Sequence, residues 1–501
     1  MPVRRLFCRG VKPLPRFHRL FPCIPCVLWF LLLPSLSATP RQWSVIETAR
    51  DNGHRLAAVA APAALPDDGQ DKSRAGSSQQ RDSNRALTLD PSQQFQEMVG
   101  FGGALTESSA YVLAQLPAAR RAEVLRRYYD PQDGLGYTLA RTHINSCDFS
   151  VNMWELDATP GDYDLHDFSL APMRKWLLPL LHDAIKASGG RLRILASPWS
   201  PPAWMKTNNR MDDGGALRGE YAPAWANYFV KFVQRMKAEE NIDIWALTVQ
   251  NEPQAKQVWE SCIYSAAQER DFIKNHLGPA LAGAGLSGVK LLGLDHNRDL
   301  LEQFADTELG DPAAAKYLWG IALHWYDPGK DFAVSARVHA RFPDKPVLFT
   351  EGCYEGGRTI GSWEHGEGYA HQMIGDIRNW VVNFMDWNIV LDERGGPNHV
   401  GNFCDAPVIV DTVTQEVRYG PSFYYLGHFS KYVQPGAHRI GSSGGPAALE
   451  SVAFANPDGS LAVVVLNRTD AAVSFTLAAG GEALACTVPA RAIQTYVGAV
   501  R

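Results

Sequence analysis

Residues 244–253 read IWALTVQNEP, and this stretch decides the fold that the sequence predicts. A second apolar run, residues 346–351, reads PVLFTE. Both runs are short and apolar and are bounded by polar turns, which is typical of buried parallel strands. Each run leads into a glutamate, Glu252 or Glu351. Carboxylates at the ends of parallel strands are expected at the mouth of a barrel, where barrel enzymes carry their chemistry.

Strand-like and helix-like segments alternate along the chain from Met98 onward. The eight predicted strands are residues 99–103, 136–143, 192–197, 244–250, 289–294, 320–325, 347–350 and 382–387. Helical stretches are predicted between them, among them 118–129, 173–188, 223–240 and 266–277. Eight such repeats predict an α/β fold, a (β/α)8 TIM barrel that spans residues 98–428.

Short strands replace helices after about residue 430, which predicts a β-sandwich over residues 429–501. The strands are 451–455, 461–466, 474–477 and 494–497, and residues 457–459 form a hairpin turn. Residues 441–445 read GSSGG and match a hydrolase elbow pattern, but Pro446 follows and we interpret them as a turn. Residues 39–97 contribute strands near Trp43 to the same sandwich, together with a polar linker at 67–84.

The first 38 residues have the layout of a secretory signal peptide. Basic residues between Arg4 and Arg19 precede an apolar run at 27–33 and a small-residue exit at 34–38. The apolar run is shorter than the roughly 20 residues that a transmembrane helix needs, and no later segment has the length and apolar character of a transmembrane helix. The sequence therefore predicts a secreted or periplasmic protein whose mature chain has no transmembrane segment.

Composition excludes some classes of protein. The 501 residues carry a net charge of -5, which gives no indication of nucleic-acid binding. Five cysteines follow the predicted signal, namely Cys147, Cys262, Cys353, Cys404 and Cys486. Their spacing predicts no disulfide framework, although one pair stays possible. His143, His324, His365 and His371 lack metal-ligand spacing, so we favour hydrogen-bonding or surface roles for them.

Polar or aromatic residues follow every predicted barrel strand. They include Glu107, Arg141, Asp148, Trp199, Asn251, Glu252, Asp295, His296, Tyr326, Glu351, Asp386 and Trp387. Because the carboxyl ends of barrel strands meet at one mouth, we expect a site lined by carboxylates, amides and indoles. Two carboxylates in one cleft are what glycoside hydrolysis needs. For Glu107 or Asp295 taken alone, we favour a structural role.

Several motifs occur together and in order: FGGALTE at 101–107, SCDFS at 146–150, ASPWS at 196–200, NEP at 251–253, HWY at 324–326, DWN at 386–388, GGPN at 395–398 and LGHFSK at 426–431. On these motifs the chain resembles glycoside hydrolase family 30, in its glucosylceramidase-like branch. The resemblance extends from about Val99 to the C-terminus.

The resemblance implies roles for individual residues. Glu252 matches the family's acid/base and Glu351 its nucleophile, while Arg141 and Tyr326 match hydrogen-bonding partners of the nucleophile and Asn251 the amide that binds the sugar 2-hydroxyl. The residues that match the lining of the glucose subsite are Asp148, Trp199, Trp387 and Asn402.

The implied mechanism is a retaining double displacement without a metal or organic cofactor. It requires carboxyl groups about 5–5.5 Å apart, rather than the roughly 6.5–9.5 Å of inverting enzymes. We expect Glu252 to have a high pKa and Glu351 a low one.

Three functional hypotheses follow. The first is a β-glucosidase of glucosylceramidase type, which would act in sphingolipid metabolism. The loop 254–262, QAKQVWESC, is polar apart from residues such as Trp259, so an endo-β-1,6-glucanase or another polysaccharide-active enzyme, such as one acting on xylan, remains an alternative. The third hypothesis is a non-catalytic glycan-binding protein, which loss of either glutamate would have favoured. The sequence decides neither exo nor endo action, nor the oligomeric state.

Overall fold

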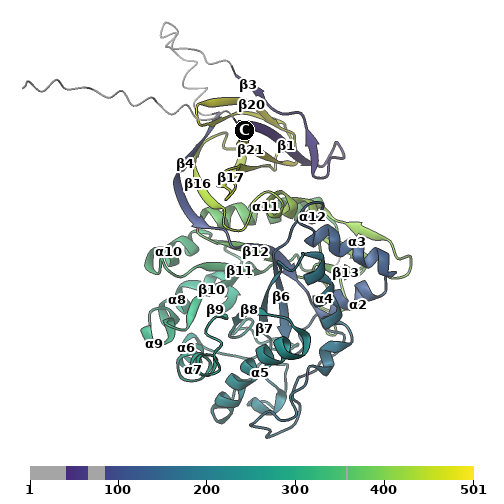
Figure 1. Ribbon diagram of the computed structural model, residues 1–501, viewed down its shortest axis with the longest axis vertical. Coiled ribbons are helices and arrows are strands. Elements are labelled where there is room, and N and C mark those ends of the chain that lie inside the picture. Colours follow the sequence, from purple (N-terminus) through teal and green to yellow (C-terminus); the bar gives the residue numbers. More distant parts are fainter. Residues whose placement is uncertain (1–40, 66–84, 357–358, 501) are drawn as a thin grey trace, which may run out of the picture. The chain divides into compact units, whose positions relative to one another are not determined.

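A computed structural model describes residues 41–65, 85–356 and 359–500 (Figure 1). The described residues all belong to one compact unit. The predicted signal peptide and the predicted linker at 67–84 lie outside the described residues.

Eight parallel strands form the barrel sheet. They are β5 (Gly100–Ala104), β6 (Leu139–Ile144), β7 (Arg193–Pro198), β8 (Ile244–Thr248), β9 (Lys290–Asn297), β10 (Leu318–His324), β11 (Val347–Glu351) and β12 (Asn383–Asp386). The sheet order is β11-β10-β9-β8-β7-β6-β5-β12, and the two end strands approach where Val382 donates its N–H to the carbonyl of Val347 at 3.1 Å. The predicted (β/α)8 barrel is confirmed.

Apolar side chains fill the inside of the barrel. The buried cluster there consists of Leu139, Leu195, Ala246, Leu292, Ala322, Leu348, Val382 and Met385. Leucine and alanine alternate from β11 to β7 along the sheet order, so that side chains from neighbouring strands fit into a packed interior rather than a pore. Because the interior is filled, the reactive side chains can lie only above this layer, at the carboxyl ends of the strands.

Helices surround these strands (Figure 1). They are α2 (Glu107–Ala114), α3 (Ala118–Tyr129), α4 (Leu177–Ala187), α5 (Ala222–Glu240), α6 (Ala266–Phe272), α7 (Gly278–Gly283), α8 (Leu301–Glu308), α9 (Pro312–Ala315), α10 (Ala333–Arg341), α11 (Trp363–Arg378) and α12 (Pro421–Ser430). The stretch predicted as one helix at 266–277 is α6 followed by a π-helical turn, η5 (Ile273–Leu277). Ser265 and Gln268 form a capping box at the start of α6.

A ten-stranded sheet forms the second domain. Its strands are β1 (Arg41–Ala49), β2 (Ala57–Val59), β3 (Ala63–Ala64), β4 (Ala86–Glu97), β16 (His438–Gly444), β17 (Leu449–Ala455), β18 (Leu461–Asn467), β19 (Val473–Ala479), β20 (Glu482–Val488) and β21 (Ala492–Val500). All nine residues of β1 pair antiparallel with β21. The predicted β-sandwich from both chain ends is therefore confirmed. A small third sheet contains β13 (Val390–Asp392), β14 (Val408–Val410) and β15 (Val417–Tyr419).

One predicted turn is wrong, because residues 441–444 belong to strand β16. Gly441 lies opposite Asp90 of β4, a strand that the sequence analysis did not predict. The sequence of β4 is largely polar. The segment is a strand because it forms hydrogen bonds with β16, which is distant in the sequence. A Cβ at Gly441 would lie 2.5 Å from Oε1 of Gln93, so a larger residue there would require the exposed Gln93 side chain to shift.

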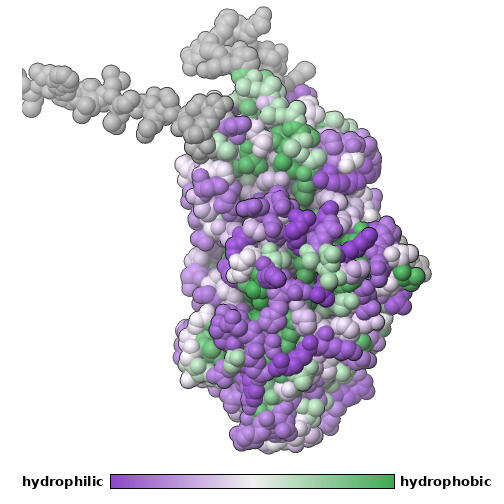
Figure 2. Space-filling view, turned by 45° about the vertical axis from the view of Figure 1, so that its right-hand side comes forward, coloured by the Kyte–Doolittle hydropathy of each residue, from purple (hydrophilic) through white to green (hydrophobic). Residues whose placement is uncertain are grey.

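Hydrophilic residues cover most of the barrel face drawn in Figure 2, and the hydrophobic ones lie in separate areas. Within the described ranges, the exposed large hydrophobic side chains are Leu65, Met153, Tyr163, Val258 and Val413, of which Val413 is 88% exposed. Scattered residues of this kind are ordinary on protein surfaces. None of the helices in the described ranges has the length and apolar character to cross a membrane.

The barrel and the sandwich meet at a buried histidine of α12. His428 contacts Thr495 Oγ1 of β21 at 2.8 Å through Nδ1 and Thr48 Oγ1 of β1 at 3.0 Å through Nε2. Burial lowers the pKa of His428 to about 3, so the ring is neutral at ordinary pH. Two threonine hydroxyls, one from each end of the chain, therefore form the hydrogen bonds of both nitrogens of the neutral His428 ring.

We expect residues 98–433 expressed alone to be insoluble or inactive, because α12 would lose both hydroxyl partners and its packing against β1 and β21. The measurement is soluble yield and thermal unfolding, compared with a chain that starts at residue 39. A soluble and active barrel without the sandwich would contradict this expectation.

Candidate active site

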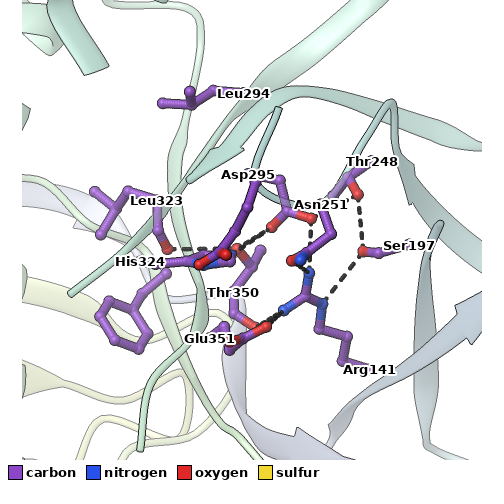
Figure 3. Close-up of polar contacts among 12 residues, drawn as sticks. Arg141, Ser197, Thr248, Asn251, Leu294, Asp295, Leu323, His324, Thr350 and Glu351 are labelled. Carbon is purple, nitrogen blue, oxygen red and sulfur yellow. Dashed lines mark hydrogen bonds and ion pairs between the residues drawn. The ribbon is translucent and has the colours of Figure 1, made fainter. Parts of the chain in front are cut away.

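A buried arginine joins five strand ends at the barrel mouth (Figure 3). Arg141, on β6, is 0% exposed, and its Nη1 donates to Oε2 of Glu351. Its Nη2 donates to Asn251 Oδ1 at 2.9 Å and to Asp295 Oδ2 at 2.7 Å, and its Nε donates to Ser197 Oγ at 3.2 Å. The planar guanidinium thus fixes groups from β7, β9 and β11 and from the residues after β8 in one arrangement.

Glu351 is the last residue of β11. Its Oε1 accepts a hydrogen bond from the Tyr326 hydroxyl at 3.0 Å, and its Oε2 accepts from Arg141. Both donors aim the carboxylate at the pocket and favour its charged form. Burial acts in the opposite direction and outweighs His324 and Arg141, so the pKa of Glu351 lies above its usual value.

Glu252 follows β8 and has a left-handed backbone, with φ at 48°. Its N–H donates to the carbonyl of Asp295 at 3.0 Å, which holds this unusual conformation. One carboxylate oxygen of Glu252 and one of Glu351 lie within 4.8 Å of each other. So close an approach of the two carboxylate oxygens fits the short carboxyl separation of retaining glycosidases, about 5–5.5 Å, better than the roughly 6.5–9.5 Å of inverting ones.

His324, at the end of β10, lies between two carboxylates. Its Nε2 is 3.0 Å from Asp295 Oδ1, and its Nδ1 is 3.5 Å from Glu252 Oε1. Burial lowers the pKa of this ring, but Glu351, Asp295 and Glu252 together raise it to about 9. Burial likewise opposes ionisation of Asp295, but Arg141 and His324 overcome it and lower the pKa of that carboxyl.

The pKa order expected from the sequence, high for Glu252 and low for Glu351, is not the order in this pocket. Burial disfavours the charged form of Glu252, but the His324 ring, whose Nδ1 is 3.5 Å from Glu252 Oε1, and the charge of His296 lower its pKa below the usual value. The physical reason is that His324 holds a proton beside Glu252. The proton that an acid catalyst would transfer therefore belongs to the Glu252–His324 pair.

The pocket also contains a polar wall and an aromatic wall. Asp148 Oδ2 accepts from Asn398 Nδ2 at 3.2 Å and from Asn402 Nδ2 at 3.3 Å. Burial raises the pKa of Asp148 to about 8. Trp199 and Trp387 stack with ring centroids 5.2 Å apart. A protonated carboxyl can both donate to and accept from sugar hydroxyls, and indole faces suit sugar rings.

Eight of the nine predicted site residues line one pocket, namely Asp148, Trp199, Asn251, Glu252, Tyr326, Glu351, Trp387 and Asn402. The ninth, Arg141, is fully buried and holds Glu351. The sequence predicted a hydrogen-bonding or surface role for His324 and a structural role for Asp295, and the structure places both residues beside the two glutamates. Asp295 also accepts from Thr248 Oγ1 at 2.7 Å and Thr350 Oγ1 at 2.6 Å. Asp295 and His324 lie near the carboxyl ends of β9 and β10, and this position was the sequence feature that could have indicated a role in the site.

The five described cysteines are buried and free. Cys353 and Cys404 line the pocket, and the Cys353 sulfur lies 3.4 Å from the Tyr326 hydroxyl. Burial raises the pKa of Cys353 well above its usual value, so it is a neutral thiol beside the site.

Comparison with known proteins places the chain in a family. Residues 98–433 match the glycosyl hydrolase family 30 TIM-barrel domain, and residues 436–496 match the glycosyl hydrolase family 30 beta sandwich domain. The chain belongs to glycosyl hydrolase family 30. It is thus an O-glycosyl hydrolase, a retaining β-glycoside hydrolase, as the motifs predicted.

Three similar proteins illustrate this family 30 membership. The lysosomal acid glucosylceramidase of Mus musculus is 39% identical over 432 residues, which cover 82% of this chain and 83% of that protein. An endo-1,6-beta-D-glucanase of Neurospora crassa is 30% identical over 493 residues, 94% of this chain and 98% of the relative. The crystal structure of SrfJ from Salmonella typhimurium superposes with a TM-score of 0.85 at 33% identity, covering 92% of this chain and 100% of SrfJ.

Proposed function

We propose that this enzyme is a β-glucosidase of glucosylceramidase type, with Glu351 as nucleophile and Glu252 as acid/base. The observation that carries the proposal is the approach of their carboxylate oxygens to within 4.8 Å beside Arg141. A covalent glycosyl-enzyme requires a carboxylate this close to the anomeric carbon while the second carboxyl reaches the leaving oxygen.

The proposed reaction has two steps. In the first, Glu351 attacks the anomeric carbon, the bond to the leaving oxygen breaks, and that oxygen takes a proton from Glu252, which His324 supplies or stabilises. In the second, Glu252 removes a proton from water, the water oxygen attacks the anomeric carbon, and Glu351 leaves as a carboxylate. Tyr326 and Arg141 hold Glu351 in both steps.

The glucose ring is proposed to lie between the polar and aromatic walls of the pocket. Asp148, Asn402 and Asn251 offer hydrogen bonds to ring hydroxyls, with Asn251 fixed by Arg141 beside the 2-hydroxyl position. Trp199 and Trp387 offer the apolar surface. Hydrogen bonds to the 2-hydroxyl that strengthen in the transition state contribute to rate.

The leaving-group side suggests a second candidate. Gln257, Asn297 and Glu355 line the pocket together with Trp259. These polar groups suit a sugar as well as a ceramide headgroup, and a family relative is an endo-1,6-beta-D-glucanase. The second candidate is therefore hydrolysis of β-1,6-linked glucan by the same catalytic pair.

The test is hydrolysis of fluorescent glucosylceramide in parallel with a β-1,6-linked glucan, using the wild type and Glu351→Gln. Lipid cleavage that disappears in the variant supports the first candidate and a role in sphingolipid metabolism. Glucan cleavage without lipid turnover supports the second candidate. Cleavage that persists in Glu351→Gln would contradict the assignment of the nucleophile.

We also propose that the protein is exported, because residues 1–38 have the layout of a signal peptide. N-terminal sequencing of the protein recovered outside the cytoplasm should begin near residue 39. A cytoplasmic protein that retains residue 1 would contradict this proposal.

Replacing His324 should change the pH dependence of activity. Within the Glu252–His324 pair the ring holds the proton, with a pKa of about 9, so His324→Asn should move the alkaline limb of kcat/KM downward by about one pH unit or more and lower its maximum. The measurement is a kcat/KM profile from pH 4 to pH 10 with an aryl β-glucoside, and exposed His166→Asn is the control. An unchanged or raised limb would contradict this role of His324.

A further inference from the structure

Two glutamates are buried against each other behind β9. Glu269 of α6 and Glu308 of α8 are both 0% exposed on two helices that pack against each other, and the two carboxyl groups are near enough to perturb each other's ionisation. Glu269 Oε1 also accepts from the N–H of Leu294 at 2.9 Å. Neither glutamate lines the active-site pocket.

The cations on the elements packed against these glutamates are engaged elsewhere. Arg270 and Lys274 pair with Asp271 and Asp311, Arg298 with Asp327 and Asp376, and Arg337 and Arg341 with Glu302, while Lys290 lies over Trp319. The histidines on these elements are His276, His296, His324 and His339, and the remaining acids are Asp295, Asp299 and Asp306. Asp295 is anionic and acts on Glu269 as a like charge. Among the described residues, no cation forms an ion pair with either glutamate.

Two ionised carboxylates cannot hydrogen bond to each other, because both are only acceptors. Glu269 Oε2 and both oxygens of Glu308 have no N–H or O–H donor among the other described residues. Contact between the two groups therefore requires a proton on one of them. Burial raises the pKa of both carboxyls well above the usual value, which keeps that proton in place near neutral pH.

The pair holds an unusual piece of backbone. Leu294 and Asp295 have left-handed φ values of 61° and 66°, and the pairing of β9 with β10 shifts register between Ala322 and Leu323. A Cβ at Gly293 would overlap Oε2 of Glu308, so Glu308 fills the space beside the glycine. This bulge turns the Asp295 side chain toward Arg141 and His324 and its carbonyl toward Glu252.

We propose that Glu269 and Glu308 share one proton and act as positioning residues, which hold the Leu294–Asp295 bulge beneath the two active-site glutamates. The link to catalysis rests on the proposed function, whereas the shared proton does not. The folded state keeps a proton that the unfolded chain releases above about pH 4.5. Stability from this pair is therefore complete below that pH and declines as pH rises, until the pair ionises.

The test uses Glu308→Gln and Glu308→Ala in the full enzyme, with exposed Glu123→Gln as the control. The Glu308→Gln amide donates to Glu269 at every pH. We expect this variant to keep its activity, and its decrease in Tm between pH 5 and pH 8 should shrink by about half. Glu308→Ala should lower Tm at both pH values and lower kcat/KM, because it removes the donor and opens a cavity.

Two results would overturn the proposal. One is a Glu308→Gln variant whose Tm follows the wild type across pH 5–8. The other is a Glu308→Gln variant that loses as much activity as Glu308→Ala, since a shared proton predicts rescue by the amide. An active Glu351→Gln enzyme would instead contradict the proposed function, and it leaves the Tm profile of the buried pair as an independent test.

Discussion

Glu351→Gln is expected to lower kcat for an aryl β-glucoside on the order of 10⁵-fold, because an amide cannot form the glycosyl-enzyme. The substitution keeps the shape of the side chain, so Tm should change little while activity is lost. Initial rates and calorimetry on the same preparations measure both effects. The exposed Glu123→Gln variant controls for amide substitution in general. A loss of less than about 100-fold would contradict Glu351 as the nucleophile.

Azide products separate the roles of the two glutamates. In Glu252→Gln, a dinitrophenyl glucoside can still form the intermediate on Glu351, and azide then enters from the opposite face to give the β-glucosyl azide. In Glu351→Gly, azide occupies the vacated side and gives the α-glucosyl azide. Proton NMR of the anomeric centre distinguishes the two products. The reverse assignment of anomers would exchange the roles proposed for Glu252 and Glu351.

Arg141→Met is expected to cost about 3–5 kcal/mol of unfolding free energy. Arg141 is fully buried, and its removal leaves Asp295 and Glu351 as buried carboxylates without their cation. His324 is then the remaining positive charge in contact with Asp295. Urea unfolding at pH 7 measures the loss, and activity should fall with it because Glu351 and Asn251 lose their common donor.

Two further variants make this prediction specific. Arg141→Lys keeps the charge but not the forked donors, so it should be less destabilised than Arg141→Met and still be impaired in catalysis. Adding Asp295→Asn to Arg141→Met should recover part of the lost stability, because one uncompensated charge disappears. An Arg141→Met enzyme within about 1 kcal/mol of wild type would contradict the account of the buried network.

The elements that the sequence predicted well are those whose pattern is local. Each barrel strand is an apolar run with polar ends, and α3 was predicted at its observed bounds of Ala118–Tyr129. Strands β4, β16 and β20 were missed because their residues are polar, glycine-rich or half exposed, and their hydrogen bonds come from distant partners. Glycine-rich residues 441–444 form a strand only because β4 lies alongside.

The sequence by itself determined the barrel, the sandwich from both chain ends and the set of residues at the barrel mouth. It could do so because apolar periodicity sets the strands and parallel strands bring their carboxyl ends together. Only the tertiary structure decided that Asp295 and His324 join the catalytic pair, that Glu252 has the lower pKa, and that Glu269 and Glu308 lie in contact. These properties depend on burial and on charges from distant parts of the chain, and neither is present in any local stretch of residues.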